Sequence, residues 1–443
     1  SRGFFYSYIS AEMKLDFKVY SLLLVSCIYL PSFGAIDMNV TQWVSISIIN
    51  SVFLAFNLIK NRADLYKAFN NRAFILYSLF FFFSILSIIQ SINATESLLK
   101  LNEIFTILCS LLILTSFYES KKIDYKFILI LVSFALGLEV LGTLNQYRLI
   151  NTYTDFDFSM ANEIRGFTGN KNISAASVAF KIPFLILLFK DLGSKKSILK
   201  IFIIIVMIAS FYVIMLYSAR AVFLSITASI FFMIILIITK YVFFKRNITF
   251  INDIKQVLVY TIPLIIAFLI FSSKYNNTER IAVDNRVVSI VNNSEDQSIQ
   301  QRIRFYGHAI SSIKENPFFG IGIGNWKLYS IKYDAINMYS YVVPYFAHND
   351  FLEIFAEIGL FGFIFFFLFY FNLIQINFGL LKTWINNDEN SNNNLIYFLP
   401  LIIYIADANL NFPLSRPLMQ VQLLMYIILI YSISNLQKNN EKQ

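Results

Sequence analysis

The chain has 443 residues, of which 57% are hydrophobic and 14% are charged. A soluble protein carries about 25% charged residues, so this composition excludes an ordinary soluble enzyme and favours a protein whose solvent is the lipid bilayer. The formal net charge of +9 indicates contact with anionic lipid headgroups rather than with nucleic acid. Cys27 and Cys109 lie far apart in apolar segments, and they predict neither a disulfide framework nor a thiol metal site.

Apolar stretches long enough to cross about 30 Å of hydrocarbon as helices recur along the chain. Charged or Asn-rich breaks separate them and predict twelve spans, at 17–33, 42–59, 73–90, 102–117, 127–146, 173–189, 199–217, 220–239, 257–272, 349–372, 395–409 and 418–434. The first lacks a cleavage site and is interpreted as a retained helix rather than a signal peptide. We assign no function to residues 1–12.

These spans predict an all-α polytopic membrane protein in three parts. A transmembrane bundle of about nine helices occupies 1–272, a large loop follows at 273–347, and about three transmembrane helices occupy 348–443. The short loops on one side hold fifteen basic residues, and those on the other side hold six. By the positive-inside rule both termini are therefore cytoplasmic, and the large loop lies outside.

The large loop contains a segment with helical periodicity. Apolar residues recur there at steps of three and four, at Ile299, Ile303, Tyr306, Ile310 and Ile313. This spacing predicts an amphipathic helix. Pro317 is expected to end the helix, and the glycines at 320, 322 and 324 predict a flexible turn before the chain re-enters the membrane.

Three residues that carry or can acquire a positive charge are predicted on the outer side at similar depth: Arg220 between two spans, Arg302 in the amphipathic helix, and His348 at the re-entry point. Guanidinium groups suit pyrophosphate oxygens, and imidazole can accept a proton from a hydroxyl group. The alternative is that Arg220 reaches lipid headgroups, that Arg302 is solvated, and that His348 is an interfacial histidine. For His308 we favour such a structural role.

Acidic residues follow His348 on one helical face: Asp350, Glu353 and Glu357. Asp350 suits a helix N-terminus, and the glutamates suit pairing with an arginine of the bundle, so all three roles can be structural. The glycines at 320–324 follow no strand, which makes a nucleotide site a poor explanation. No motif predicts a metal site.

Four segments resemble the bacterial O-antigen ligase and polymerase superfamily. The most specific is AHNDFLE at 347–353 continuing to AEIGLFG at 356–362; the others are QRIRFY at 301–306 with ENPFFGIG at 315–322, SARAVFL at 218–224, and RGFTGNKN at 165–172. Ala221 stands where the family commonly has glycine, and Tyr306 where it has tryptophan. These departures bear on the identity of the acceptor more than on the class of reaction.

The resemblance implies an inverting glycosyltransferase of the bacterial inner membrane that uses neither metal nor cofactor. It would move a glycan from an undecaprenyl pyrophosphate-linked donor to a hydroxyl acceptor, lipid A-core or another glycan, at the periplasmic face. His348 would be the catalytic residue, and Arg220 and Arg302 would bind the pyrophosphate. Supporting roles would fall to Arg165, Asn172, Asn349, Asp350 and Glu357.

Several functions stay open. The same motifs serve O-antigen ligases, which we favour, polysaccharide polymerases, and protein O-oligosaccharyltransferases. A polysaccharide transporter or flippase is an alternative from another class, but it is expected to show internal repeats and charges spread through the membrane depth. A structural scaffold does not explain arginines placed beside a histidine.

Overall fold

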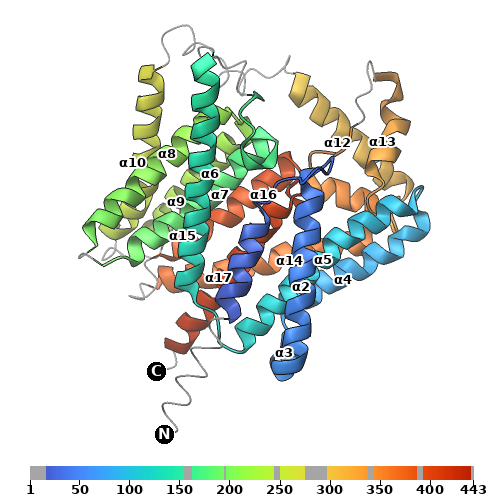
Figure 1. Ribbon diagram of the computed structural model, residues 1–443, viewed down its shortest axis with the longest axis horizontal. Coiled ribbons are helices and arrows are strands. Elements are labelled where there is room, and N and C mark those ends of the chain that lie inside the picture. The colour runs from blue at the N-terminus through green and yellow to red at the C-terminus, as the bar shows by residue number, and fades with distance from the viewer. Residues whose placement is uncertain are drawn as a thin grey trace. The chain divides into compact units, whose positions relative to one another are not determined.

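The computed structural model describes residues 16–153, 162–193, 196–243, 250–274, 297–337, 344–386 and 393–440. Its described part is all-helical and contains no strand, which confirms the predicted class (Figure 1). The chain divides into two compact units. The first comprises Ser1–Asp124, Ser294–Gln375 and Ala408–Ile428, and the second comprises Tyr125–Asn293, Ile376–Asp407 and Leu429–Gln443.

The first unit is built on α5 and its neighbours. Helices α2, α3 and α4 all pack against α5. Asn93 caps α5, because its side chain accepts hydrogen bonds from the backbone N–H groups of Thr95 and Glu96. The elements of this unit are a helix at 16–27, α2 (Met38–Lys60), α3 (Arg62–Ala68), α4 (Arg72–Leu86), η1 (Ser87–Gln90), α5 (Ala94–Glu119), α12 (Gln297–Glu315), α13 (Trp326–Asp334), η4 (Ala335–Asn337) and η6 (Pro413–Ser415).

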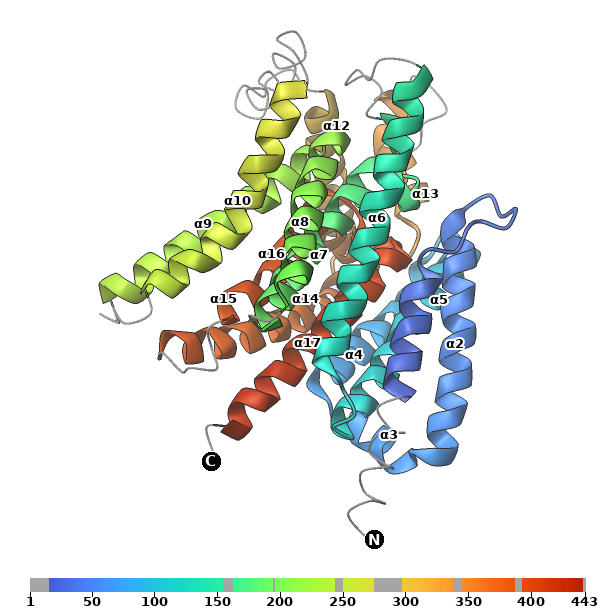
Figure 2. The same cartoon turned by 60° about the vertical axis from the view of Figure 1, so that its left-hand side comes forward.

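Two helices begin in the first unit and continue in the second: α14 (Asp350–Ile385) and α17 (Pro417–Asn440). The other elements of the second unit are α6 (Tyr125–Tyr153), η3 (Gly166–Thr168), α7 (Lys171–Asp191), α8 (Ser197–Tyr217), α9 (Arg220–Phe243), α10 (Phe250–Lys274), α15 (Asn394–Tyr397) and most of α16 (Leu399–Leu410). Helix α7 packs against α6 and α8, and α8 packs against α10 (Figure 2).

Ten of the described helices are long and apolar enough to cross a membrane. They match ten of the predicted spans, and the other two coincide with shorter helical stretches at 16–27 and 394–410. The length and apolar composition of these helices are those of a multi-pass membrane protein. The count of twelve and the three-part division at 272 and 347 stay predictions.

The amphipathic helix of the large loop is confirmed as α12, which ends at Glu315, two residues before Pro317. The glycine turn after it differs from the expectation, because it is docked rather than loose. The N–H of Ile321 donates to the carbonyl of Ala356 at 3.0 Å, and the N–H of Gly322 donates to that of Glu357 at 2.9 Å. These bonds hold the turn against α14.

Glycine is required on both sides of this contact. Gly320 and Gly359 have φ angles of 68° and 69°, a region that side chains with a Cβ rarely adopt. A Cβ at Gly320 would collide with the carbonyl oxygen of Glu357, and a Cβ at Gly359 would collide with that of Phe318. Gly359 also interrupts the helical geometry of α14. The two backbones therefore approach each other more closely than any other residue type allows.

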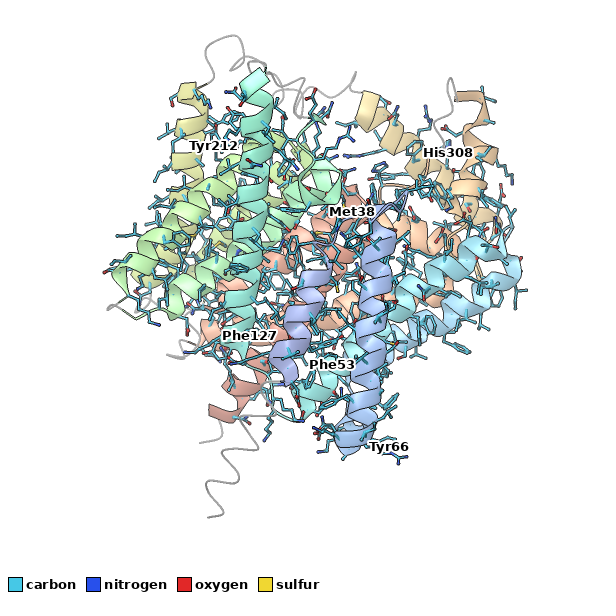
Figure 3. All side chains as sticks on the ribbon, viewed as in Figure 1. Met38, Phe53, Tyr66, Phe127, Tyr212 and His308 are labelled. Atoms are coloured by element: carbon cyan, nitrogen blue, oxygen red, sulfur yellow. The ribbon has the colours of Figure 1, made fainter. Side chains whose placement is uncertain are left out.

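Within the first unit, the ends of α5 have different neighbours. Near the start of α5, Ser97 donates to the carbonyl of Ile323 at 2.7 Å. After its end, Lys122 donates to the side chain of Asn61, which precedes α3, at 3.0 Å. Since α5 has 26 residues and a helix rises about 1.5 Å per residue, the glycine turn and α3 are separated by about 39 Å along α5. Figure 3 marks the two ends of the α2–α3 segment with Met38 and Tyr66.

Four buried charged residues in the second unit form two ion pairs. The ammonium group of Lys181 lies 2.7 Å from the carboxylate of Glu139, and the hydroxyl of Ser177 donates to the same carboxylate at 2.8 Å. At the far end of α9, Lys240 lies 2.9 Å from Asp253. A charge in hydrocarbon costs about 3 kcal/mol when unpaired, so these contacts explain how the helices tolerate four ionised residues.

Candidate functional site

His348 lies in the turn that leads into α14, and its backbone is strained. Its φ angle is 57°, in the left-handed region, where residues other than glycine are uncommon and often functional. The residue on each side is anchored to α14. The N–H of Ala347 donates to the carboxylate of Glu353 at 2.7 Å, and the side chain of Asn349 caps the helix by accepting from the N–H of Leu352 at 3.0 Å.

Tyr306 of α12 holds the same turn from the other side. Its hydroxyl lies 2.8 Å from the carbonyl oxygen of Asn409 and 3.2 Å from that of His348. The amide group of Asn349 also donates to the side chain of Asn409, at 3.4 Å. Helix α12, the end of α16 and the start of α14 therefore meet at His348.

The imidazole ring of His348 lies between aromatic side chains. Phe305 stacks nearly parallel to it at 6.4 Å between ring centroids, and Phe412 meets it edge to face at 5.3 Å. The Nδ1 atom is buried and has no hydrogen-bond partner among the described residues. A buried polar atom without a partner is costly, and such atoms occur where a ligand or water completes the bonding.

The surroundings keep this imidazole neutral. Burial lowers the pKa of His348 to about 4, and the positive charge of Arg302 on α12 contributes in the same direction. The neutral ring has a free lone pair, so it can accept a proton from a hydroxyl group. The structure thus brings together two of the three predicted residues, Arg302 and His348.

The acidic face of α14 has a positioning role. We expected Glu353 or Glu357 to pair with an arginine, but their hydrogen bonds come from backbone N–H groups instead. Glu357 accepts from the N–H of Trp326 at 2.8 Å, and Asp350 accepts from that of Leu414 at 2.9 Å. Backbone N–H groups can satisfy these acidic side chains because the loops around the start of α14 present N–H groups that no helix pairs.

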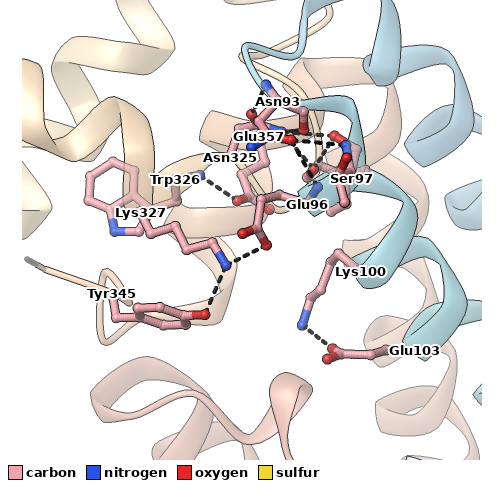
Figure 4. A network of polar contacts seen from close by, with 12 residues as sticks. Asn93, Glu96, Ser97, Lys100, Glu103, Asn325, Trp326, Lys327, Tyr345 and Glu357 are labelled. Carbon is pink, nitrogen blue, oxygen red and sulfur yellow. Dashed lines mark hydrogen bonds and ion pairs between the residues drawn. The ribbon is translucent and has the colours of Figure 1, made fainter. Parts of the chain in front are cut away.

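A polar network ties the loop before α13 to α5 (Figure 4). The side chain of Asn325 donates to Ser97 at 2.8 Å and accepts from the N–H of Asn93 at 2.8 Å. Lys327 forms an ion pair with Glu96 at 2.5 Å and donates to the hydroxyl of Tyr345 at 2.8 Å. Because Tyr345 is three residues before His348, this network also fixes the approach to the site.

Sequence reasoning missed the end of α16 and the segment between α16 and α17. The end of α16 supplies Asn409, and the segment after it supplies Phe412 and Arg416, whose guanidinium group lies over the Phe412 ring at 4.8 Å from its centroid. Arg416 is one of the six basic residues of the predicted outer loops, and it was given no role in the site. The signal that could have identified Arg416 as a candidate site residue was its position as a cation at the edge of a predicted span.

The remaining predicted residues belong to the second unit. Arg220 is the first residue of α9, two residues after the left-handed Ser218 that ends α8. Gly166 packs so closely against Tyr217 and Ser174 that a Cβ would collide with both hydroxyl groups, and this contact joins the Arg165 segment to the Arg220 segment.

Arg165 and Asn172 have different surroundings within that unit. The side chain of Arg165 is exposed and donates to the carbonyl of Asn162 at 3.3 Å. The cap of α7 is Asn170, which accepts from the N–H of Asn172 at 2.9 Å. Asn172 is therefore part of the first turn of α7 rather than its capping residue.

Residues 204–367 match the family described as O-antigen ligase. This segment of the chain is similar to the O-antigen ligase and polymerase superfamily. This match confirms the resemblance found in the sequence, and it spans Arg220, Arg302 and His348. The O-antigen ligase domain is of the membrane glycosyltransferase type. No curated protein matched the chain.

Proposed function

We propose that the chain is an inverting, metal-independent glycosyltransferase. It moves a glycan from undecaprenyl pyrophosphate to a hydroxyl acceptor, and its best assignment is an O-antigen ligase with lipid A-core as the acceptor. The site faces the periplasm of a bacterial inner membrane, with both termini in the cytoplasm. The O-antigen ligase match supports the class, and the loop charges support the orientation.

The observation that carries this proposal is the state of His348. Its ring is neutral, its Nδ1 atom is unpartnered among the described residues, and a guanidinium group lies near it. A neutral imidazole beside a fixed cation is suited to a reaction in which a hydroxyl loses a proton while an anionic group departs.

The reaction balances with these groups. The acceptor oxygen attacks the anomeric carbon and forms the new glycosidic bond, while its proton passes to the imidazole of His348. The bond between the anomeric carbon and the phosphate oxygen breaks with inversion, and the electron pair leaves with undecaprenyl pyrophosphate. In this proposal Arg302 and Arg220 bind that pyrophosphate and stabilise the charge that develops on it.

The pKa of His348 is part of the proposal. A base with a pKa near 4 is weak at neutral pH, but its pKa is lowered in part by the charge of Arg302. Binding of pyrophosphate to Arg302 offsets that charge, so the pKa of His348 rises when the donor is present. The donor thereby strengthens the base that the acceptor needs.

The test is a deletion strain complemented with variants of the full chain. Loss of long glycan chains with accumulation of lipid-linked polymer indicates a ligase, whereas accumulation of single repeat units indicates a polymerase. His348→Ala should fail to complement, with transfer reduced by about 100-fold or more. His308→Ala is the matched control, because His308 stacks on Tyr333 rather than at the turn before α14, and it should complement. Complementation by His348→Ala would overturn the proposed role.

A further inference from the structure

Arg416 lies at the His348 site and has no role in the mechanism above. We propose that Arg416 binds a phosphate group of a substrate at this site. The inference rests on the proposed function, which brings a lipid-linked pyrophosphate and a phosphate-bearing acceptor to His348. The experiment that tests this inference measures phosphate binding directly. Its result therefore supports or contradicts the role of Arg416 whether or not glycan transfer is observed.

The position of the guanidinium group is defined by one aromatic ring. The group lies 4.8 Å from the centroid of Phe412, and the same ring meets the imidazole of His348 at 5.3 Å. Phe412 is held in turn by Phe346, which stacks on it at 4.0 Å with an interplanar angle of 9°. Arg416 and His348 therefore flank a rigid aromatic side chain.

The backbone beneath Arg416 is also fixed. The N–H of Leu414 donates to Asp350 at 2.9 Å, and the ammonium group of Lys100 donates to the hydroxyl of Ser415 at 2.7 Å. Asp350 begins the helix that carries the His348 turn, so the two segments are anchored to the same helix end. A preorganised cation loses little entropy on binding an anion.

The charge of Arg416 is not neutralised by the described residues. Its Nε atom is buried without a hydrogen-bond partner, and no described carboxylate forms an ion pair with it. Burial lowers the pKa of Arg416, and the more distant Asp37 and Glu103 act against that effect. The guanidinium group nevertheless stays charged, because arginine is not deprotonated in proteins. A half-buried guanidinium group whose Nε–H lacks a partner can be satisfied by an external oxyanion.

Phosphate is the oxyanion that fits both substrates of the proposed function. The carrier lipid of the proposed donor has a pyrophosphate group, and an acceptor that bears phosphate groups would present the same kind of oxyanion. The forked donors of a guanidinium group match phosphate oxygens in either case. The proposal is therefore a phosphate-binding role, and the experiment separates the two sources.

The test uses the full chain in phosphatidylcholine nanodiscs, titrated calorimetrically with inorganic pyrophosphate and with inorganic phosphate. Arg416→Met keeps an unbranched stem over Phe412 but removes the charge, and it should weaken binding of at least one probe by about tenfold. Arg416→Lys should weaken it less, because the charge is kept and the fork is lost.

Arg62→Met is the matched control. Arg62 also lies over an aromatic ring, 5.5 Å from the centroid of Tyr66, but at the α3 end of the first unit (Figure 3). This variant should bind both probes as the wild type does. Unchanged dissociation constants for both probes in folded Arg416→Met would overturn the proposal. If Arg416→Met does not fold, unchanged constants in Arg416→Lys would overturn it.

Kinetics then assign the source. A KM raised for the lipid-linked donor in Arg416→Lys identifies the carrier pyrophosphate, and a KM raised for the acceptor identifies the acceptor phosphate. A failure of the proposed function looks different, because transfer is then absent from the wild type while the titrations still report on Arg416.

Discussion

The carboxylate of Glu353 accepts a hydrogen bond from the backbone N–H of Ala347 at 2.7 Å. This bond spans the turn in which His348 adopts its left-handed backbone conformation, and it joins the first turn of α14 to the residue before His348. Because Glu353 is buried, the bond is not exchanged for water. The orientation of the imidazole therefore depends on a carboxylate that need not touch the substrate.

Glu353→Gln should lower the kcat for transfer by roughly tenfold while the KM for the donor changes little, because the amide group offers the N–H of Ala347 one acceptor oxygen where the carboxyl group offers two. Glu353→Ala should also cost about 1–3 kcal/mol of unfolding free energy, since it leaves the N–H of Ala347 unpaired. Steady-state kinetics and thermal unfolding measure both effects. Glu315→Gln is the control, because Glu315 pairs with Lys332 at an exposed site. Equal kcat values for wild type and Glu353→Gln would contradict this role.

Arg302→Gln should raise the pKa of His348 from about 4 toward its ordinary value. A nearby guanidinium disfavours the charged imidazolium, so removing it favours protonation. Because the chain has only two histidines, His308 and His348, NMR titration of labelled histidine follows both.

Arg304→Gln is the matched control for that titration. Arg304 pairs with Asp334 at 2.8 Å and lowers the pKa of His308, so its loss should raise the pKa of His308 and leave that of His348 unchanged. A pKa of His348 that is the same in wild type and Arg302→Gln would mean that burial alone sets it.

Gly359→Ala should destabilise the chain by at least about 1–2 kcal/mol, because it places a Cβ at a positive φ angle and against the carbonyl of Phe318. Gly307→Ala in α12 meets nothing within 4 Å and should be neutral or stabilising. Thermal unfolding in detergent gives the comparison. Equal melting temperatures for the two variants would show that the close backbone approach is dispensable.

Arg220→Lys should weaken binding of the lipid-linked donor by about tenfold, because the charge is kept but the forked geometry is lost. Arg148→Lys is the control, since Arg148 donates only to Asn145 one turn earlier on α6. Titration with the donor measures both. An unchanged donor dissociation constant in Arg220→Lys would argue against its contact with pyrophosphate.

Cysteines at two exposed lysines should test the orientation. Lys332 on α13 and Lys67 on α3 have side chains that are 54% and 61% exposed. In intact spheroplasts an impermeant thiol reagent should label Lys332→Cys and not Lys67→Cys, because α13 is predicted outside and α3 inside. Both native cysteines are buried and give little background. The reverse pattern would invert the predicted topology.

Most of the helical architecture was predictable from the sequence. Continuous apolar runs and the periodicity of α12 are local signals, since a helix in lipid must satisfy its own backbone. The two spans at 17–33 and 395–409 coincide with helical stretches, at 16–27 and 394–410, that are shorter than the roughly 20 residues of a membrane-crossing helix. Helix α14 continues to Ile385, beyond the predicted end of the span at 372, and Gly359 alters its geometry without ending it.

The site divides in the same way. The sequence by itself determined the membrane class, the amphipathic helix, and the selection of Arg302 and His348 as candidate site residues. Charge and hydrophobicity are properties of individual residues, so they can be recognised without the tertiary structure. Only the tertiary structure decided that Tyr306 and Glu353 clamp the turn at His348, and that Phe412 and Arg416 join it from a segment more than 60 residues away. These partners depend on long-range packing and on backbone N–H groups, and neither leaves a pattern along the chain.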